Sequence, residues 1–187
     1  MTLQSKLVRM TAMLALAVTA LSAHAHGQAR NSGAKTIALQ AVLAPSLTVA
    51  LSGNAVNFNM AFGSPSNPGN TSITATTSWA LNTAIGFVSL YAYFGSSASA
   101  LTDGAGNNIP SADFQISDNG GAFNALNTTV PFGGANAGRR VAATLIFLNN
   151  TSGSRTDVMN FNINLSTLPN LPAGNYTGTL TIQAQAI

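Results

Sequence analysis

The sequence predicts an all-β protein, an antiparallel β-sandwich of about eight or nine strands. Three observations support this prediction. Apolar residues recur at every second position in most runs after Thr36, turn-forming residues separate those runs, and no helical period lies between them. The chain contains no cysteine, so core packing and backbone pairing must stabilise the fold without disulfides.

Residues 1–25 are predicted to be a secretory signal peptide that is cleaved after Ala25. Lys6 and Arg9 form a basic start, and an uncharged, mostly apolar run of 12 residues follows at 10–21. A membrane-spanning helix needs roughly 20 apolar residues. We therefore expect a secreted protein, located in the periplasm or at the cell surface, with no membrane span in its mature form.

The mature chain is expected to comprise a flexible N-terminal arm at 26–35 and a single β-sandwich domain at 36–187. The arm is polar and glycine-rich. The mature part carries five basic residues and four aspartates, a formal charge of +1, and the whole chain has no glutamate. The mature part has no cluster of basic residues that could neutralise a run of phosphates, so we expect no nucleic-acid partner.

The first expected strand has a single apolar face. Thr36 opens it, and its inward positions are Ile37, Leu39, Ala41 and Leu43. Pro45 ends this run, because proline cannot donate a hydrogen bond to a central ladder. A second run follows, with Leu47, Val49 and Leu51 on one face. The later expected strands are residues 73–81, 85–94, 114–117, 141–148, 158–165 and 176–186.

Two of the later runs predict different environments. In residues 158–165, Met159, Phe161 and Ile163 alternate with asparagines, which predicts one dry face and one face coated with amides. Residues 141–148 are nearly all apolar, which predicts a central strand covered on both sides.

The chain offers little material for catalysis, and we expect no enzyme. After cleavage the only histidine is His26, so no serine has an evident base. Asp113 and Asp118 are expected to flank a hairpin tip. Asp103 opens a loop that has some ligands suited to calcium but no further acidic residue, so a polar turn is the better interpretation. We expect no metal and no cofactor.

Two segments resemble a known family. Residues 37–58 (IALQAVLAPSLTVALSGNAVNF) and 171–182 (LPAGNYTGTLTI) are similar to the first and last strands of bacterial spore coat protein U-type and fimbrial subunit domains. Gly174 and Tyr176 match the Gly-x-Tyr that opens that family's last strand. Leu47 follows Ser46 where the family usually has a cysteine, and the chain ends without the family's aromatic residue near the terminus.

The resemblance implies an Ig-like sandwich, a periplasmic chaperone as partner, and assembly with related surface subunits by donation of a strand. The candidate donor strand is 36–43. An ordinary first strand that pairs within its own domain is an equal alternative.

We therefore expect a structural or adhesive subunit of the cell surface that is fimbria-like and self-associates by strand pairing. The alternative is a monomeric secreted module that binds carbohydrate or cell wall, with Trp79, Tyr91 and Tyr93 as candidate platform aromatics. Trp79-Ala80-Leu81 also resembles the Trp-x-Leu signature of Gram-positive cell-wall-binding domains.

Overall fold

The structure is a computed structural model that describes residues 35–82 and 85–187. The predicted signal peptide and all but the last residue of the predicted arm lie outside the described residues. The chain divides into two units, Met1–Ala41 and Val42–Ile187. In the first unit, the described residues 35–41 form neither strand nor helix. No helix of the described residues is long and apolar enough to cross a membrane.

The second unit contains a large antiparallel sheet built around its longest strand, β10 (Ser152–Ile163). Strand β10 pairs with β3 (Ile73–Ala80) along one edge and with β7 (Phe114–Asp118) along the other. The sheet then ends on either side in an edge strand. The remaining members are β1 (Ser46–Leu51) next to β3, β8 (Asn124–Ala125) next to β7, and β2 (Asn67–Pro68) against the end of β10.

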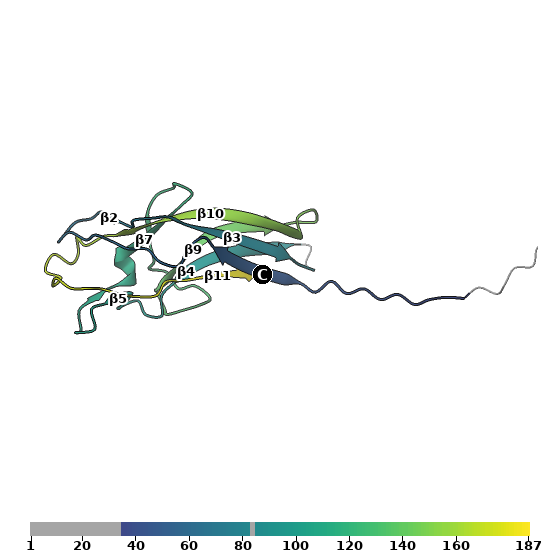
Figure 1. Ribbon diagram of the computed structural model, residues 1–187, viewed down its shortest axis with the longest axis horizontal. Helices are drawn as coiled ribbons and strands as arrows, with labels where there is room; N and C mark the ends of the chain where they lie inside the picture. Colours follow the sequence, from purple (N-terminus) through teal and green to yellow (C-terminus); the bar gives the residue numbers. More distant parts are fainter. Residues whose placement is uncertain (1–34, 83–84) are drawn as a thin grey trace, which may run out of the picture. The chain divides into compact units, whose positions relative to one another are not determined.

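A three-stranded antiparallel sheet forms the opposite layer, as Figure 1 shows. Its order is β11 (Thr181–Ala186), β4 (Gly86–Tyr93), β9 (Gly138–Ile146). A short hairpin of β5 (Leu101–Thr102) and β6 (Asn108–Ile109) precedes a single 3-10 turn, η1 (Ser111–Asp113).

The all-β sandwich prediction is confirmed, and the strand count is higher than expected. Eleven strands occur in the described residues, against an expected eight or nine. Four of them, β2, β5, β6 and β8, have only two residues each. Runs of two residues are too short for an alternating pattern, so periodicity cannot reveal them.

The core lies between the two sheets and is filled by alternate residues of each. In β10, Met159, Phe161 and Ile163 are buried, as the pattern predicts. The opposite face is less exposed to solvent than the pattern predicts, because Asn162 is buried. Its side chain accepts a hydrogen bond from the Asn67 backbone N–H at 2.7 Å and donates to Gln115 at 2.8 Å.

The prediction that residues 141–148 form a central strand covered on both sides is wrong. The strand they belong to, β9, is an edge strand of the three-stranded sheet. Ala142 and Ile146 face the core, whereas Leu145 and Phe147 are exposed on the outer side. An unbroken apolar run has no period, so it cannot tell which neighbours cover a strand.

The strand predicted at 36–43 is also absent. Residues 35–45 have no assigned secondary structure, and β1 begins at Ser46. A strand exists only where its backbone pairs with a neighbour, and an alternating pattern shows only that a segment is suited to such pairing.

Candidate binding groove

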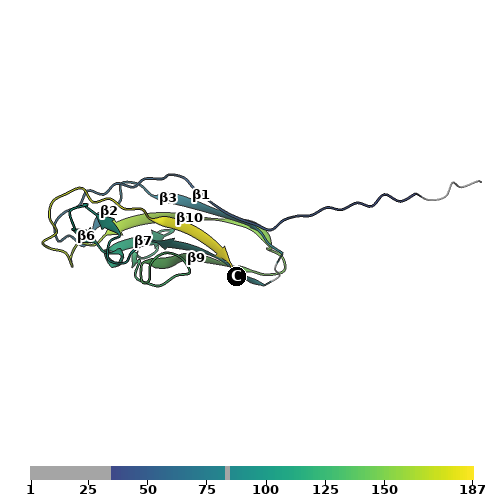
Figure 2. The same ribbon diagram turned by 90° about the horizontal axis from the view of Figure 1, so that it is seen from below.

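Two strand edges, one from each sheet, flank an open side of the sandwich. Strand β1 pairs with β3, and β11 pairs with β4, and neither has a second strand partner among the described residues. An edge strand presents a row of backbone N–H and C=O groups that can pair with another strand. This side of the sandwich thus has two such edges, one on each layer. Figure 2 shows the two layers from the side.

The chain on this open side runs as two irregular segments with a groove between them. One wall is the segment that follows β1, residues 53–60, and the other is the segment that leads into β11, residues 174–180. The groove has a volume of about 490 Å³. Pockets of this size hold a drug-sized ligand or several side chains.

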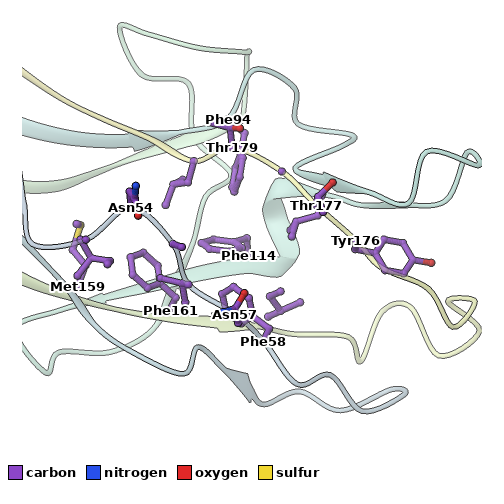
Figure 3. Close-up of a pocket in the computed structure, with 18 of the residues that line it drawn as sticks. Asn54, Asn57, Phe58, Phe94, Phe114, Met159, Phe161, Tyr176, Thr177 and Thr179 are labelled. Atoms are coloured by element: carbon purple, nitrogen blue, oxygen red, sulfur yellow. The ribbon is translucent and has the colours of Figure 1, made fainter.

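The floor of the groove is the main hydrophobic core. Figure 3 shows Phe114 between the segment that carries Asn54 and Asn57 and the segment that carries Thr177 and Thr179, with Met159 and Phe161 next to the first of these segments. Phe114 makes edge-on contacts with Phe58 and Phe94, with ring centroids 5.8 and 5.1 Å apart. The floor of the groove is therefore lined by packed aromatic rings.

Tight backbone contacts fix the wall that leads into β11. Thr177 and Thr102 exchange two backbone hydrogen bonds of 2.9 Å. Next to them, a Cβ on Gly178 would lie 2.0 Å from the Ala100 carbonyl oxygen, so only glycine allows this approach. The Tyr176 hydroxyl donates to the Pro172 carbonyl at 2.8 Å. Burial, and to a lesser extent the Asp103 charge, raises the pKa of Tyr176.

Most of the candidate donor residues are apolar, like the floor of the groove. Ile37, Leu39 and Leu43 are between 84% and 92% exposed, and Thr36 and Ala41 are exposed as well. Apolar side chains at alternate positions of an extended segment all point to one side. The segment 36–43 can therefore present one continuous apolar edge to a groove.

The structure separates the three candidate platform aromatics. Trp79 is 7% exposed and packs with Val88 and Ile146 in a small core cluster, and its Nε1 donates to the Asn150 carbonyl at 2.9 Å. It lies on β3, in the large sheet, whereas Tyr91 and Tyr93 lie on β4, in the other sheet. Trp79 is thus a core residue and does not contribute to a shared surface.

Tyr91 and Tyr93 instead meet Phe132, which the sequence analysis did not single out. Phe132 lies 5.9 Å from the Tyr91 ring and 5.8 Å from the Tyr93 ring. The Tyr93 hydroxyl donates to Gln183 at 2.7 Å. Tyr91 is buried, while Tyr93 and Phe132 are partly exposed. No pattern identified Phe132, since it comes from a loop 40 residues away in the sequence.

Asp113 and Asp118 lie far apart, and the expected hairpin tip between them is wrong. Asp113 ends η1, directly before β7, and Asp118 ends β7, which places them roughly 16 Å apart at the rise of an extended strand. Paired glycosidase carboxyls lie only about 5–9.5 Å apart. Asp113 accepts hydrogen bonds from the Thr167 hydroxyl, and burial raises its pKa.

The loop at Asp103 is a polar turn. The Asp103 carboxylate accepts hydrogen bonds from the backbone N–H groups of Ala105 and Asn107 and from the Asn107 side chain. The Asn107 side chain is the main cause that lowers the pKa of Asp103. The described residues contain no group of three or more His, Cys, Asp or Glu side chains that could hold a metal ion.

A cluster of charged side chains around buried Asp157 lies on the large sheet, and none of its members lines the groove. Asp157 is fully buried, and Arg155 donates to it from Nε at 2.7 Å. Arg155 NH2 also lies 3.6 Å from Asp118. Burial, with a further contribution from the Asp157 charge, raises the pKa of Asp118.

Comparison with known proteins gives no identification. No protein-family model and no curated protein matches this chain.

Proposed function

We propose that this protein is a secreted structural subunit of the cell surface that assembles with copies of itself by strand pairing. The segment 36–43 of one copy, called here the arm strand, occupies the groove of the next. The observation that carries the proposal is the open groove between the segment after β1 and the segment before β11, next to two single-partnered edge strands, in a chain whose preceding segment is apolar at alternate positions.

The chemistry of the two parts is complementary. The groove floor is aromatic and aliphatic, and the arm strand offers Ile37, Leu39, Ala41 and Leu43. Each large aliphatic side chain that becomes fully buried contributes roughly 1.5–3 kcal/mol. The backbone of the arm strand would pair with the free edges, as in other cases where an added strand completes a sheet.

The composition supports the same role. Only 6% of the residues are charged, so the long-range repulsion between copies is weak. Secretion and the surface location follow from the signal peptide predicted at 1–25, and a periplasmic chaperone is the partner that the family resemblance implies.

A pair of matched substitutions tests the arm strand. Leu39→Asp places a charge on the apolar side, and Gln40→Asp places the same charge on the opposite side. We expect Leu39→Asp to weaken self-association of the mature protein at least tenfold, measured by sedimentation velocity over a range of concentrations. Gln40→Asp should leave it within about twofold. Equal association of the two variants would overturn the role of the arm strand.

A second pair tests the groove. Leu51 lines it and is 45% exposed, and the adjacent Ala50 points to the other face of β1. A synthetic peptide of residues 36–43 should bind the Ala50→Asp variant and fail to bind Leu51→Asp, in a fluorescence anisotropy titration. Circular dichroism spectra that match the unmodified protein would show that both variants fold. Binding of the peptide to Leu51→Asp with unchanged affinity would contradict the proposal.

The cluster of Tyr91, Tyr93 and Phe132 favours a second candidate, a carbohydrate- or cell-wall-binding module. Partly exposed aromatic rings provide a face on which a sugar ring can stack. Pull-down of the mature protein with insoluble cell-wall polysaccharide tests this function. A positive result that Tyr93→Ala abolishes would establish it, and no retention on any polysaccharide would exclude it.

A further inference from the structure

A cluster of large apolar side chains is exposed at one end of the sandwich. We call it the apolar pole, and its members are 50–72% exposed. They come from the start of β4, the end of β9, the turn after β9 and the end of the chain that follows β11. The residues are Ile85, Phe87, Leu145, Phe147, Leu148 and Ile187.

Backbone pairing brings these residues together. Phe87 is directly opposite Leu145 in the β4–β9 register. On its other side, Phe87 exchanges two backbone hydrogen bonds with Ile187, of 2.8 and 3.0 Å. Since cross-strand neighbours on one face lie about 5 Å apart, Phe87, Leu145 and Ile187 form a contiguous patch.

The turn that carries Phe147 and Leu148 is held in place by Asn150. The Asn150 side chain donates to the Leu145 carbonyl at 2.8 Å and accepts from the Phe147 backbone N–H. Its backbone N–H donates to the Phe147 carbonyl at 2.8 Å, and its own carbonyl accepts from buried Trp79. The two apolar side chains are therefore displayed by a fixed turn.

The segments that form the pole, 85–88, 144–151 and 184–187, contain no Asp, Glu, Lys or Arg. Contiguous exposed apolar patches larger than a few hundred Å² are rare on monomers, and such patches mark interaction sites. The run at 141–148 has apolar residues on both of its faces, but this domain covers only one of them. A partner bound at the pole would cover the other face.

The place where the chain enters the sandwich indicates what covers the pole. Strand β1 begins at Ser46, which pairs with Ala80, and Ala80 in turn pairs with Ser152. Figures 1 and 2 show the start of β1, the end of β3 and the C-terminus at the same end of the sandwich. Only Ala44 and Pro45 separate the arm strand from β1.

A two-residue link reaches at most about 10 Å between its flanking residues. A copy that holds the arm strand must therefore lie against the end of the sandwich where β1 begins. We propose that the apolar pole is a second contact between adjacent copies of this chain, and that the copy whose groove takes up the arm strand covers it. This inference rests on the proposed function.

Substitutions at the pole test the inference separately from strand uptake. The pole variant combines Phe87→Thr, Leu145→Thr and Phe147→Ser, and Leu148→Ser alone is a milder variant in the turn. The control combines Phe62→Ser and Phe123→Ser, which remove phenylalanines outside the pole that are 70% and 45% exposed. All are measured in the full mature protein, by sedimentation velocity for self-association and by anisotropy for binding of the 36–43 peptide.

We expect the pole variant to weaken self-association at least tenfold and Leu148→Ser at least threefold, while both bind the peptide as the unmodified protein does. The control should associate normally. Normal association of a folded pole variant that binds the peptide would overturn the second contact and leave strand uptake intact. Failure of the unmodified protein to bind the peptide would overturn the proposed function instead.

Discussion

Arg155 and Asp157, two residues apart on β10, form an ion pair between a partly exposed guanidinium and a fully buried carboxylate. The Nε–Oδ1 distance is 2.7 Å, and the Arg155 NH1 group donates to the Ala143 carbonyl of β9 at 3.0 Å. This side chain therefore links the two sheets across the core. Arg155 stabilises the fold mainly because its positive charge compensates the buried negative charge of Asp157.

Arg155→Met should lower the free energy of unfolding by about 3 kcal/mol. Removal of one partner leaves the other as an uncompensated buried charge, and the partial exposure of Arg155 limits the loss. Adding Asp157→Asn to Arg155→Met should restore most of the difference, since no buried charge remains. Urea denaturation followed by circular dichroism measures both. A double variant no more stable than Arg155→Met would contradict this account.

The stability of the protein should depend on the pH through Asp113. Burial raises the pKa of its carboxyl in the folded state, so folding favours the protonated form. The resulting stabilisation is fully present below the unfolded-state pKa, about 3.9, and is lost as the pH rises through the folded-state pKa. Asp113→Asn cannot ionise, so its stability relative to the unmodified protein should increase from pH 3 to pH 7.

Asp103 is the control for Asp113, because its pKa is shifted in the opposite direction. Its pKa is lowered, chiefly by the hydrogen bond from the Asn107 side chain, so its contribution is present above the unfolded-state pKa and is lost on acidification. Asp103→Asn should therefore lose stability relative to the unmodified protein as the pH rises. Both differences are read from urea midpoints at matched pH values. Parallel curves for the two variants would show that the assigned causes are wrong.

Trp79, the only tryptophan, should report on the core. Because its ring is buried, native emission should be shifted to short wavelength, resist quenching by acrylamide, and move to long wavelength on unfolding. Trp79→Phe keeps most of the ring but leaves the Asn150 carbonyl without its donor, at a cost of about 1–2 kcal/mol. Trp79→Ala should cost about 3–5 kcal/mol. Native emission typical of an exposed indole would contradict the packing.

Gly178→Ala should lower the free energy of unfolding by about 2 kcal/mol or more. The new methyl group would meet the Ala100 carbonyl oxygen at 2.0 Å, and relief requires movement of backbone rather than of a side chain. Gly95→Ala is the matched control, since a Cβ there has nothing within 4 Å. Thermal melts of the two variants side by side provide the measurement. A Gly178→Ala variant as stable as Gly95→Ala would exclude the close approach of these two segments.

Much of the fold could be predicted from the sequence, because alternation reports directly on which residues face the core. Met159, Phe161 and Ile163 illustrate this, since each points inward as its parity requires. Asn162 shows the limit of the method. Its neighbours in space, Asn67 and Gln115, lie 95 and 47 residues away in the sequence, and their amide hydrogen bonds allow burial of a position that the pattern marks as wet.

Only one part of the candidate site could be predicted from the sequence. The alternating apolar residues Ile37, Leu39 and Leu43, on which the proposed arm strand rests, are visible in the sequence, but the groove is not a sequence feature. It forms because β1 and β11 end up on different sheets, each with one partner, and this depends on strand order. Phe132 was missed for a similar reason, since a loop brings it to Tyr91 and Tyr93.

The sequence by itself determined the all-β class, the absence of disulfides and the inward face of a clearly alternating strand such as β10, because these depend on local pattern and composition. Only the tertiary structure decided that β9 is an edge strand, that Phe132 meets Tyr91 and Tyr93, and that the apolar pole and the groove exist. The physical reason is that strand order and cover are set by contacts between distant segments, and a side-chain period of two carries no information about which neighbour a strand will have.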